Sequence, residues 1–61
     1  MNVDQNKIFI ETSWEILRKN LEERCFEEAD RIITHVENQG FAKEAWDMFD
    51  ELKAARNGHD I

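Results

Sequence analysis

Apolar residues recur along the first two thirds of the chain at steps of three and four positions. They form a stripe with Leu21 and Ile32 near its centre, made of Ile10, Trp14, Leu17, Leu21, Cys25, Ala29, Ile32 and Val36. At about 100° per residue these side chains fall within roughly a 120° arc of a helix, the width of a core-facing surface. No glycine or proline interrupts residues 12–38, so the pattern predicts one long helix there.

The start of this helix has two candidate signals. Thr12 and Glu15 have the spacing of a capping box, in which hydroxyl and carboxylate each accept a hydrogen bond from a free amide at the helix start. Asn2 and Gln5 offer an earlier candidate with the same spacing. If Thr12 caps the helix, residues 1–11 form a flexible arm.

A second apolar stripe follows a predicted turn at residues 39–40. Gly40 suits the left-handed position just after a helix, and Phe41 would then pack on Val36. The second stripe consists of Phe41, Ala45, Met48, Phe49, Leu52 and Ala55. It predicts a helix over residues 41–56, followed by a tail over residues 57–61.

Two helices joined by so short a link must run antiparallel, which makes a helical hairpin the expected all-α fold of one domain over residues 1–61. The first helix would be roughly 40 Å long and the second only about 24 Å. Much of the first stripe would therefore stay uncovered. Two hairpins could cover it by dimerising into a four-helix bundle, or the chain could break near residues 22–25 and form three helices. Because those residues contain no glycine, proline or strong N-cap, we favour the homodimer.

Composition also favours association with a partner. A chain of 61 residues buries too little surface to be very stable alone, and Cys25 is its only cysteine. A metal site would need more ligands than Cys25, His35 and His59 supply. Neither a secretory leader nor an apolar run near 18 residues is evident, so we expect a cytoplasmic protein that does not enter a membrane.

The formal net charge of −6 disfavours binding to nucleic acid or to an anionic membrane. The sequence offers no clear pair of nucleophile and base, since Cys25 lies on the apolar stripe and His35 suits a cap in the last helical turn. The acidic pairs at residues 22–23 and 27–28 lack the Glu-x-x-His partner of bundle metal sites. We therefore expect no enzyme, no cofactor and no metal.

The segment FEEADRIITHVENQG at residues 26–40 resembles the second helix of a pentatricopeptide or tetratricopeptide repeat, and residues 44–58 echo it. The echo pairs Glu28-Ala29 with Glu44-Ala45, sixteen positions later. Those families bind RNA bases or peptides on stacks of several repeats, whereas this chain has room for fewer than two. We carry over no binding residue from the resemblance.

Several large apolar side chains fall outside the two stripes or at their edges. Phe9 and Ile16 lie almost opposite the first stripe, and Trp46 lies about a quarter turn from the centre of the second. With Phe26 and Ile33, which flank the first stripe, they are the candidate partner-binding residues, because aromatic and large apolar side chains often anchor interfaces.

The sequence thus predicts a small acidic protein–protein interaction module that regulates, links or inhibits another protein, with a basic nucleic-acid-binding protein as one candidate partner. The alternative is a nucleic-acid-binding hairpin dimer. It would use a local basic patch of Arg18, Lys19, Arg24 and Arg31.

Overall fold

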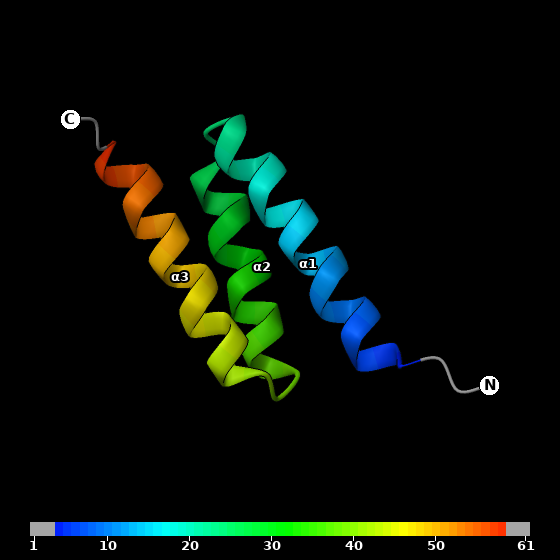
Figure 1. Cartoon of the computed structure of the whole chain (residues 1–61). Coiled ribbons are helices and arrows are strands. Elements are labelled where there is room, and N and C mark those ends of the chain that lie inside the picture. The colour runs from blue at the N-terminus through cyan, green and yellow to red at the C-terminus, as the bar shows by residue number, and fades with distance from the viewer. Residues whose placement is uncertain (1–3, 59–61) are drawn as a thin grey trace.

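Three helices form the part of the chain that the structure, a computed structural model, describes, namely residues 4–58 (Figure 1). α1 spans Gln5–Glu22, α2 spans Phe26–Asn38 and α3 spans Ala42–Asn57. Residues 4–58 contain no strand, which confirms the all-helical class. The number of helices fits the three-helix alternative, and the single helix predicted over residues 12–38 is wrong.

The predicted long helix is interrupted at Arg24, whose φ of +59° is left-handed. The amide of Cys25 donates to the carbonyl oxygen of Asn20 at 2.7 Å, and the amide of Arg24 donates to that of Leu21 at 3.1 Å. This hydrogen-bond pair is a Schellman motif with Arg24 in the position that glycine usually occupies. The motif ends α1 and reverses the chain into α2.

The break escapes sequence analysis because a residue with a Cβ is disfavoured in this conformation by about 1–2 kcal/mol. Packing of α2 and α3 over the apolar stripe of α1 offsets that cost. The Arg24 guanidinium also lies 5.1 Å from the centroid of the Phe26 ring, a cation–π contact across the link.

Replacing Arg24 by glycine and by alanine separates these two contributions. Both variants lose the cation–π contact, but only glycine relieves the left-handed strain. We expect Arg24→Gly to be more stable than Arg24→Ala by about 1 kcal/mol. Urea denaturation followed by circular dichroism measures the difference, and equal midpoints would show that residue 24 is not left-handed in solution.

α1 begins earlier than the capping box at Thr12 implies. The Asp4 carboxylate accepts a hydrogen bond from the amide of Lys7 at 3.1 Å and caps the helix. Residues 5–11 are therefore helical and do not form an arm, because burial of Phe9 and Ile10 against the core stabilises the first turns. The other cap candidate, Asn2, lies outside the described residues.

α2 ends in a second Schellman motif at Gly40, where the sequence places the turn. Gly40 has a φ of +97°. The amide of Phe41 donates to the carbonyl oxygen of Val36 at 3.2 Å, and the amide of Gly40 donates to that of Glu37 at 3.0 Å. The two helix ends share one geometry, but only this one has a glycine at the left-handed position, so only this one is predictable from the sequence.

Gly40→Val is expected to destabilise the fold by about 1–2 kcal/mol through backbone strain, since valine disfavours positive φ. No atom lies within 4 Å of the Cβ that the substitution adds, so the cost comes from the backbone alone. Gly58→Val is the control. Gly58 also has positive φ, but it follows the last turn of α3, which can fray without disturbing the core. Equal melting temperatures for Gly40→Val and the unmodified chain would contradict this geometry.

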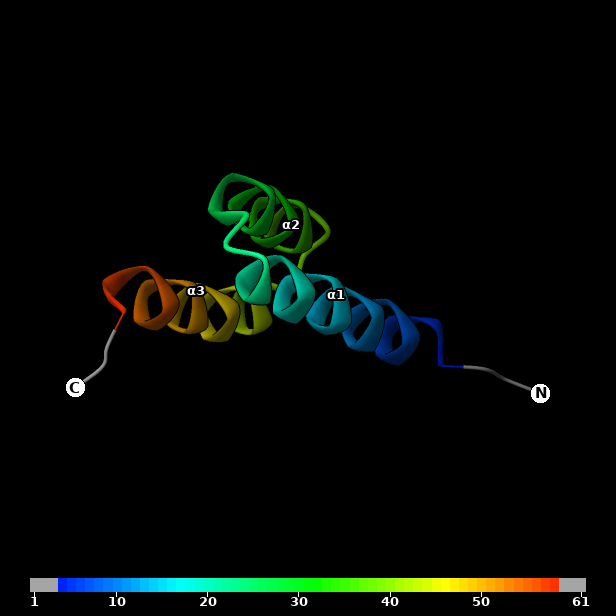
Figure 2. The same ribbon diagram turned by 90° about the horizontal axis from the view of Figure 1, so that it is seen from above.

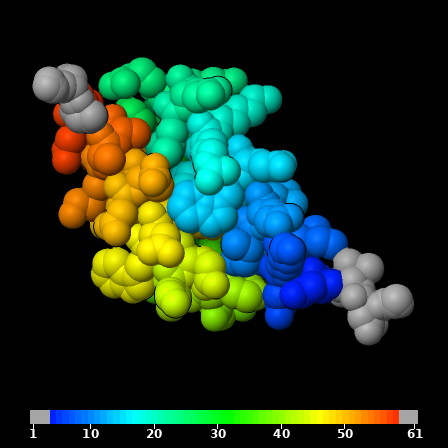
Figure 3. All heavy atoms as spheres, viewed as in Figure 1, coloured from blue at the N-terminus to red at the C-terminus, as the bar shows by residue number. Residues whose placement is uncertain are grey.

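α1 and α3 lie side by side in one layer, and α2 packs across both from one side (Figure 2). In the space-filling view the side chains of α1 and α3 meet and hide most of α2 (Figure 3). The buried apolar core draws on all three helices and consists of Leu17, Ala29, Ile33, Val36, Ala45, Met48 and Leu52. The middle of the α1 stripe, at Leu17, is thus covered within one chain, while Ile10, Trp14 and Leu21 are partly buried.

Candidate interaction groove

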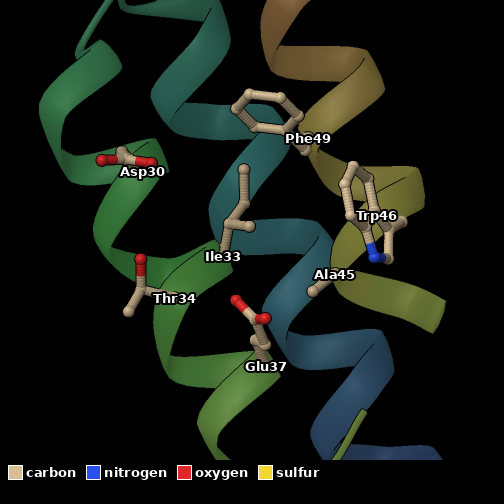
Figure 4. A pocket seen from close by; sticks show the side chains of 7 residues that line it. All are labelled: Asp30, Ile33, Thr34, Glu37, Ala45, Trp46 and Phe49. Carbon is tan, nitrogen blue, oxygen red and sulfur yellow. The ribbon is translucent and has the colours of Figure 1, made fainter. Parts of the chain in front are cut away.

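A groove of about 320 Å³ runs between α2 and α3. It is lined by Asp30, Ile33, Thr34, Glu37, Ala45, Trp46 and Phe49 (Figure 4). In that view the ribbon of α1 passes behind the floor, so the groove opens on the face turned away from α1. No helix of residues 4–58 covers it.

The floor of the groove is apolar and belongs to the core. Ile33 from α2 and Ala45 from α3 keep only 6% and 4% of their surface exposed. Both lie on the inward faces by which the two helices pack. Because Ala45 is small, the groove remains open between the larger side chains on either side.

The wall formed by α3 is aromatic. Trp46 is 66% exposed, and its ring centroid lies 6.4 Å from that of the half-buried Phe49 at an interplanar angle of 85°. Such edge-to-face contacts are favourable, so Phe49 supports one side of the indole. The Phe49 ring also has a cation nearby, since the Lys53 Nζ lies 5.9 Å from its centroid.

The wall formed by α2 is polar and acidic. Asp30, Thr34 and Glu37 stand at positions i, i+4 and i+7, so they follow one face of α2 for two turns. Residues 4–58 contain a single ion pair, between Arg31 and Glu28 at 3.3 Å. The Asp30 and Glu37 carboxylates are therefore without a cationic partner in the described part of the chain.

Two of the predicted partner-binding residues meet in this groove. Trp46 is its exposed wall, whereas Ile33 is its buried floor and offers only its edge to a ligand. Ile16 is 43% exposed on α1 and does not line the groove. Phe26 is half-buried under the guanidinium of Arg24.

Phe9 is not an outward-facing residue. Its ring centroid lies 5.6 Å from that of His35 and 5.5 Å from that of Phe41, so it joins the start of α1 to the end of α2 and the start of α3. The sequence places Phe9 opposite the stripe of one helix, but two helices contact α1 from different sides. Phe9 is therefore half-buried and packs against the core.

The acidic wall is the part of the groove that sequence analysis misses. In the sequence, an ordinary solvated helix face would show the same residues, Asp30, Thr34 and Glu37. Only the structure shows that Ile33 is buried beside them. Their spacing of four and three positions was the available signal. Ile8, which is 50% exposed on α1, was also not among the predicted residues.

Two residues with reactive side chains, Cys25 and His35, make local contacts near the ends of α2. Cys25 is half-buried at the start of α2, and its thiol donates to the carbonyl oxygen of Glu23 at 3.8 Å. His35 is exposed in the last turn of α2 and contacts Phe9 edge-on. His59 lies outside the described residues.

Three of the four cations in the predicted basic patch, all but Lys19, have a local contact. The Arg18 guanidinium lies 5.1 Å from the Trp14 ring centroid, Arg24 lies over Phe26, and Arg31 pairs with Glu28. A phosphate at Arg31 would have to compete with that carboxylate. Nothing in this arrangement favours the nucleic-acid-binding alternative.

Within residues 4–58, no set of three or more His, Cys, Asp and Glu side chains is grouped as metal ligands would be. In the same range no helix combines the length and the apolar character needed to cross a membrane. Comparison of the chain with models of known families, with curated proteins and with solved structures gives no match.

Proposed function

We propose that this chain is a small acidic protein–protein interaction module, without enzymatic activity, that regulates, links or inhibits another protein. The exposure of Trp46 carries the proposal. A tryptophan that leaves 66% of its surface in water beside an apolar groove forgoes much of the free energy that its burial would release. Aromatic side chains in this setting are the most frequent anchors of protein interfaces.

Charge supports a basic partner. The chain carries a formal net charge of −6, and two carboxylates of the groove, Asp30 and Glu37, have no cation beside them. Complementary charge accelerates encounter and disfavours acidic partners. A nucleic-acid-binding protein is one kind of basic partner, since the acidic face could compete with phosphate for its surface.

The binding unit that we propose is a single chain. The homodimer expected from the sequence rested on an uncovered stripe along one long helix. Here Leu17, in the middle of α1, is fully buried by the packing of three helices. The stripe therefore no longer calls for a second copy, and the acidic charge of the chain opposes one.

Quantitative affinity purification with the tagged chain tests this proposal. We expect a specific protein to be retained, and its recovery to fall about tenfold with Trp46→Ala, the loss typical of an interface anchor. Ile8→Ala is the matched control, because Ile8 is also exposed but lies outside the groove. Circular dichroism should show the same helicity for both variants. Recovery that is unaffected by Trp46→Ala, or lost equally with both variants, would contradict the proposal.

A further inference from the structure

We infer that the groove between α2 and α3 receives a basic amphipathic helix of the partner, with apolar side chains facing Trp46 and Ile33 and cations facing Asp30 and Glu37. This inference rests on the proposed function and specifies the chemistry of the docking segment. It is carried by the length of the groove, by its two unlike walls and by its charge.

The length of the groove suits a helix. On α2 the lining runs from Asp30 to Glu37, which is about 10 Å along the helix axis. A helix laid along it presents residues i, i+3, i+4 and i+7 over the same distance. The apolar floor and the aromatic wall then receive the residues at i+3 and i+4.

The charge of the groove selects the flanking residues. Asp30 and Glu37 stand seven positions apart on one face of α2, so a partner helix with lysine or arginine at i and i+7 matches both. No cation lines the groove itself. Lys53 contacts one lining residue, Phe49, which belongs to the aromatic wall. The carboxylates of the acidic wall are therefore available to pair with cations of the partner.

The same charges argue against a second copy in the groove. A copy of this chain would bring a further formal charge of −6 to a wall that is already acidic. Like charges across an interface disfavour association. A partner helix with two lysines and a small apolar face removes this repulsion and covers the indole of Trp46.

A designed peptide provides the probe. It is an acetylated and amidated alanine-based helix of about fifteen residues, with leucines at i+3 and i+4 between lysines at i and i+7. Two matched peptides carry glutamates in place of the lysines, or alanines in place of the leucines. Binding is followed by NMR through the indole N–H resonance of Trp46, identified by its absence in Trp46→Phe.

We expect the lysine–leucine peptide to shift this resonance saturably, and each control peptide to bind about tenfold more weakly or not at all. Asp30→Asn with Glu37→Gln should remove most of the preference for lysine over glutamate. Glu15→Gln with Glu22→Gln changes the net charge equally on α1, outside the groove, and should preserve that preference.

Any of the following results would overturn the inference. The lysine and glutamate peptides could bind equally, the α1 charge control could remove the preference as fully as the groove variant, or dilution alone could shift the Trp46 resonance. The last result would place a second copy in the groove. Absence of peptide binding would also overturn it, and a cellular partner lost with Trp46→Ala would then show that the proposed function stands with a different docking segment.

Discussion

Leu17→Ala is expected to unfold the chain or leave it barely folded. Leu17 is completely buried, and truncating such a side chain costs about 2–5 kcal/mol through lost burial and the cavity left behind. A domain of this size has only a few kcal/mol of stability in all. The expected result is loss of most helical circular dichroism at 25 °C, or a urea midpoint close to zero.

Ile16→Ala is the control for this prediction, because Ile16 is the preceding residue of α1 but is 43% exposed. Its effect should lie within about 0.5 kcal/mol of zero, as is usual at surface sites. Leu21 and Ile32, which the sequence places at the centre of the stripe, are only half-buried. Replacing them by alanine should cost less than Leu17→Ala. Similar losses for Leu17→Ala and Ile16→Ala would contradict the orientation of α1.

Ala29→Leu is expected to destabilise the fold by about 1–3 kcal/mol through overpacking. Ala29 has no exposed surface and lies in the core cluster where α2 packs on its neighbours. Three additional carbon atoms there would force α2 away from them. The loss is measurable as a lower melting temperature, with a shift of several degrees for a domain of this length.

Ala54→Leu is the matched control, since Ala54 belongs to α3 but is exposed. Leucine is nearly as good a helix former as alanine, so this variant should melt within a degree or two of the unmodified chain. A stabilising effect of Ala29→Leu would mean that the helices leave a cavity at that position. The close packing of α2 described above would then be incorrect.

Local signals in the sequence account for most of the fold. The three- and four-residue spacing identifies the apolar faces, and fully buried Leu17, Val36 and Met48 all lie on the predicted stripes. The turn at Gly40 is equally local, because glycine is the residue that tolerates its φ without strain.

The chain reversal at Arg24 could not be predicted from local sequence signals. It depends on a residue that locally disfavours its own conformation, and the energy that compensates comes from contacts between α1, α2 and α3. A helix-breaking signal was absent because tertiary packing, not local propensity, ends α1. The expectation of a homodimer rested partly on this unbroken helix and partly on the small size of the chain.

The candidate site was predictable only in part. Trp46 stands out in the sequence because it lies off its stripe, and the structure leaves it exposed. The acidic wall could not be predicted, since Asp30 and Glu37 line a groove only because α3 packs beside α2. Phe9 shows the opposite case, in which a residue off the stripe is half-buried because its ring packs against His35 and Phe41.

The central claim is that one chain closes its own core and keeps the groove between α2 and α3 free for a different protein. Sedimentation equilibrium of the purified chain at tens of micromolar tests it most directly. We predict a single species at the chain mass of 7.3 kDa that still unfolds cooperatively. A stable species of twice that mass, converted to the monomer by Trp46→Ala, would contradict the claim by showing that a second copy occupies the groove.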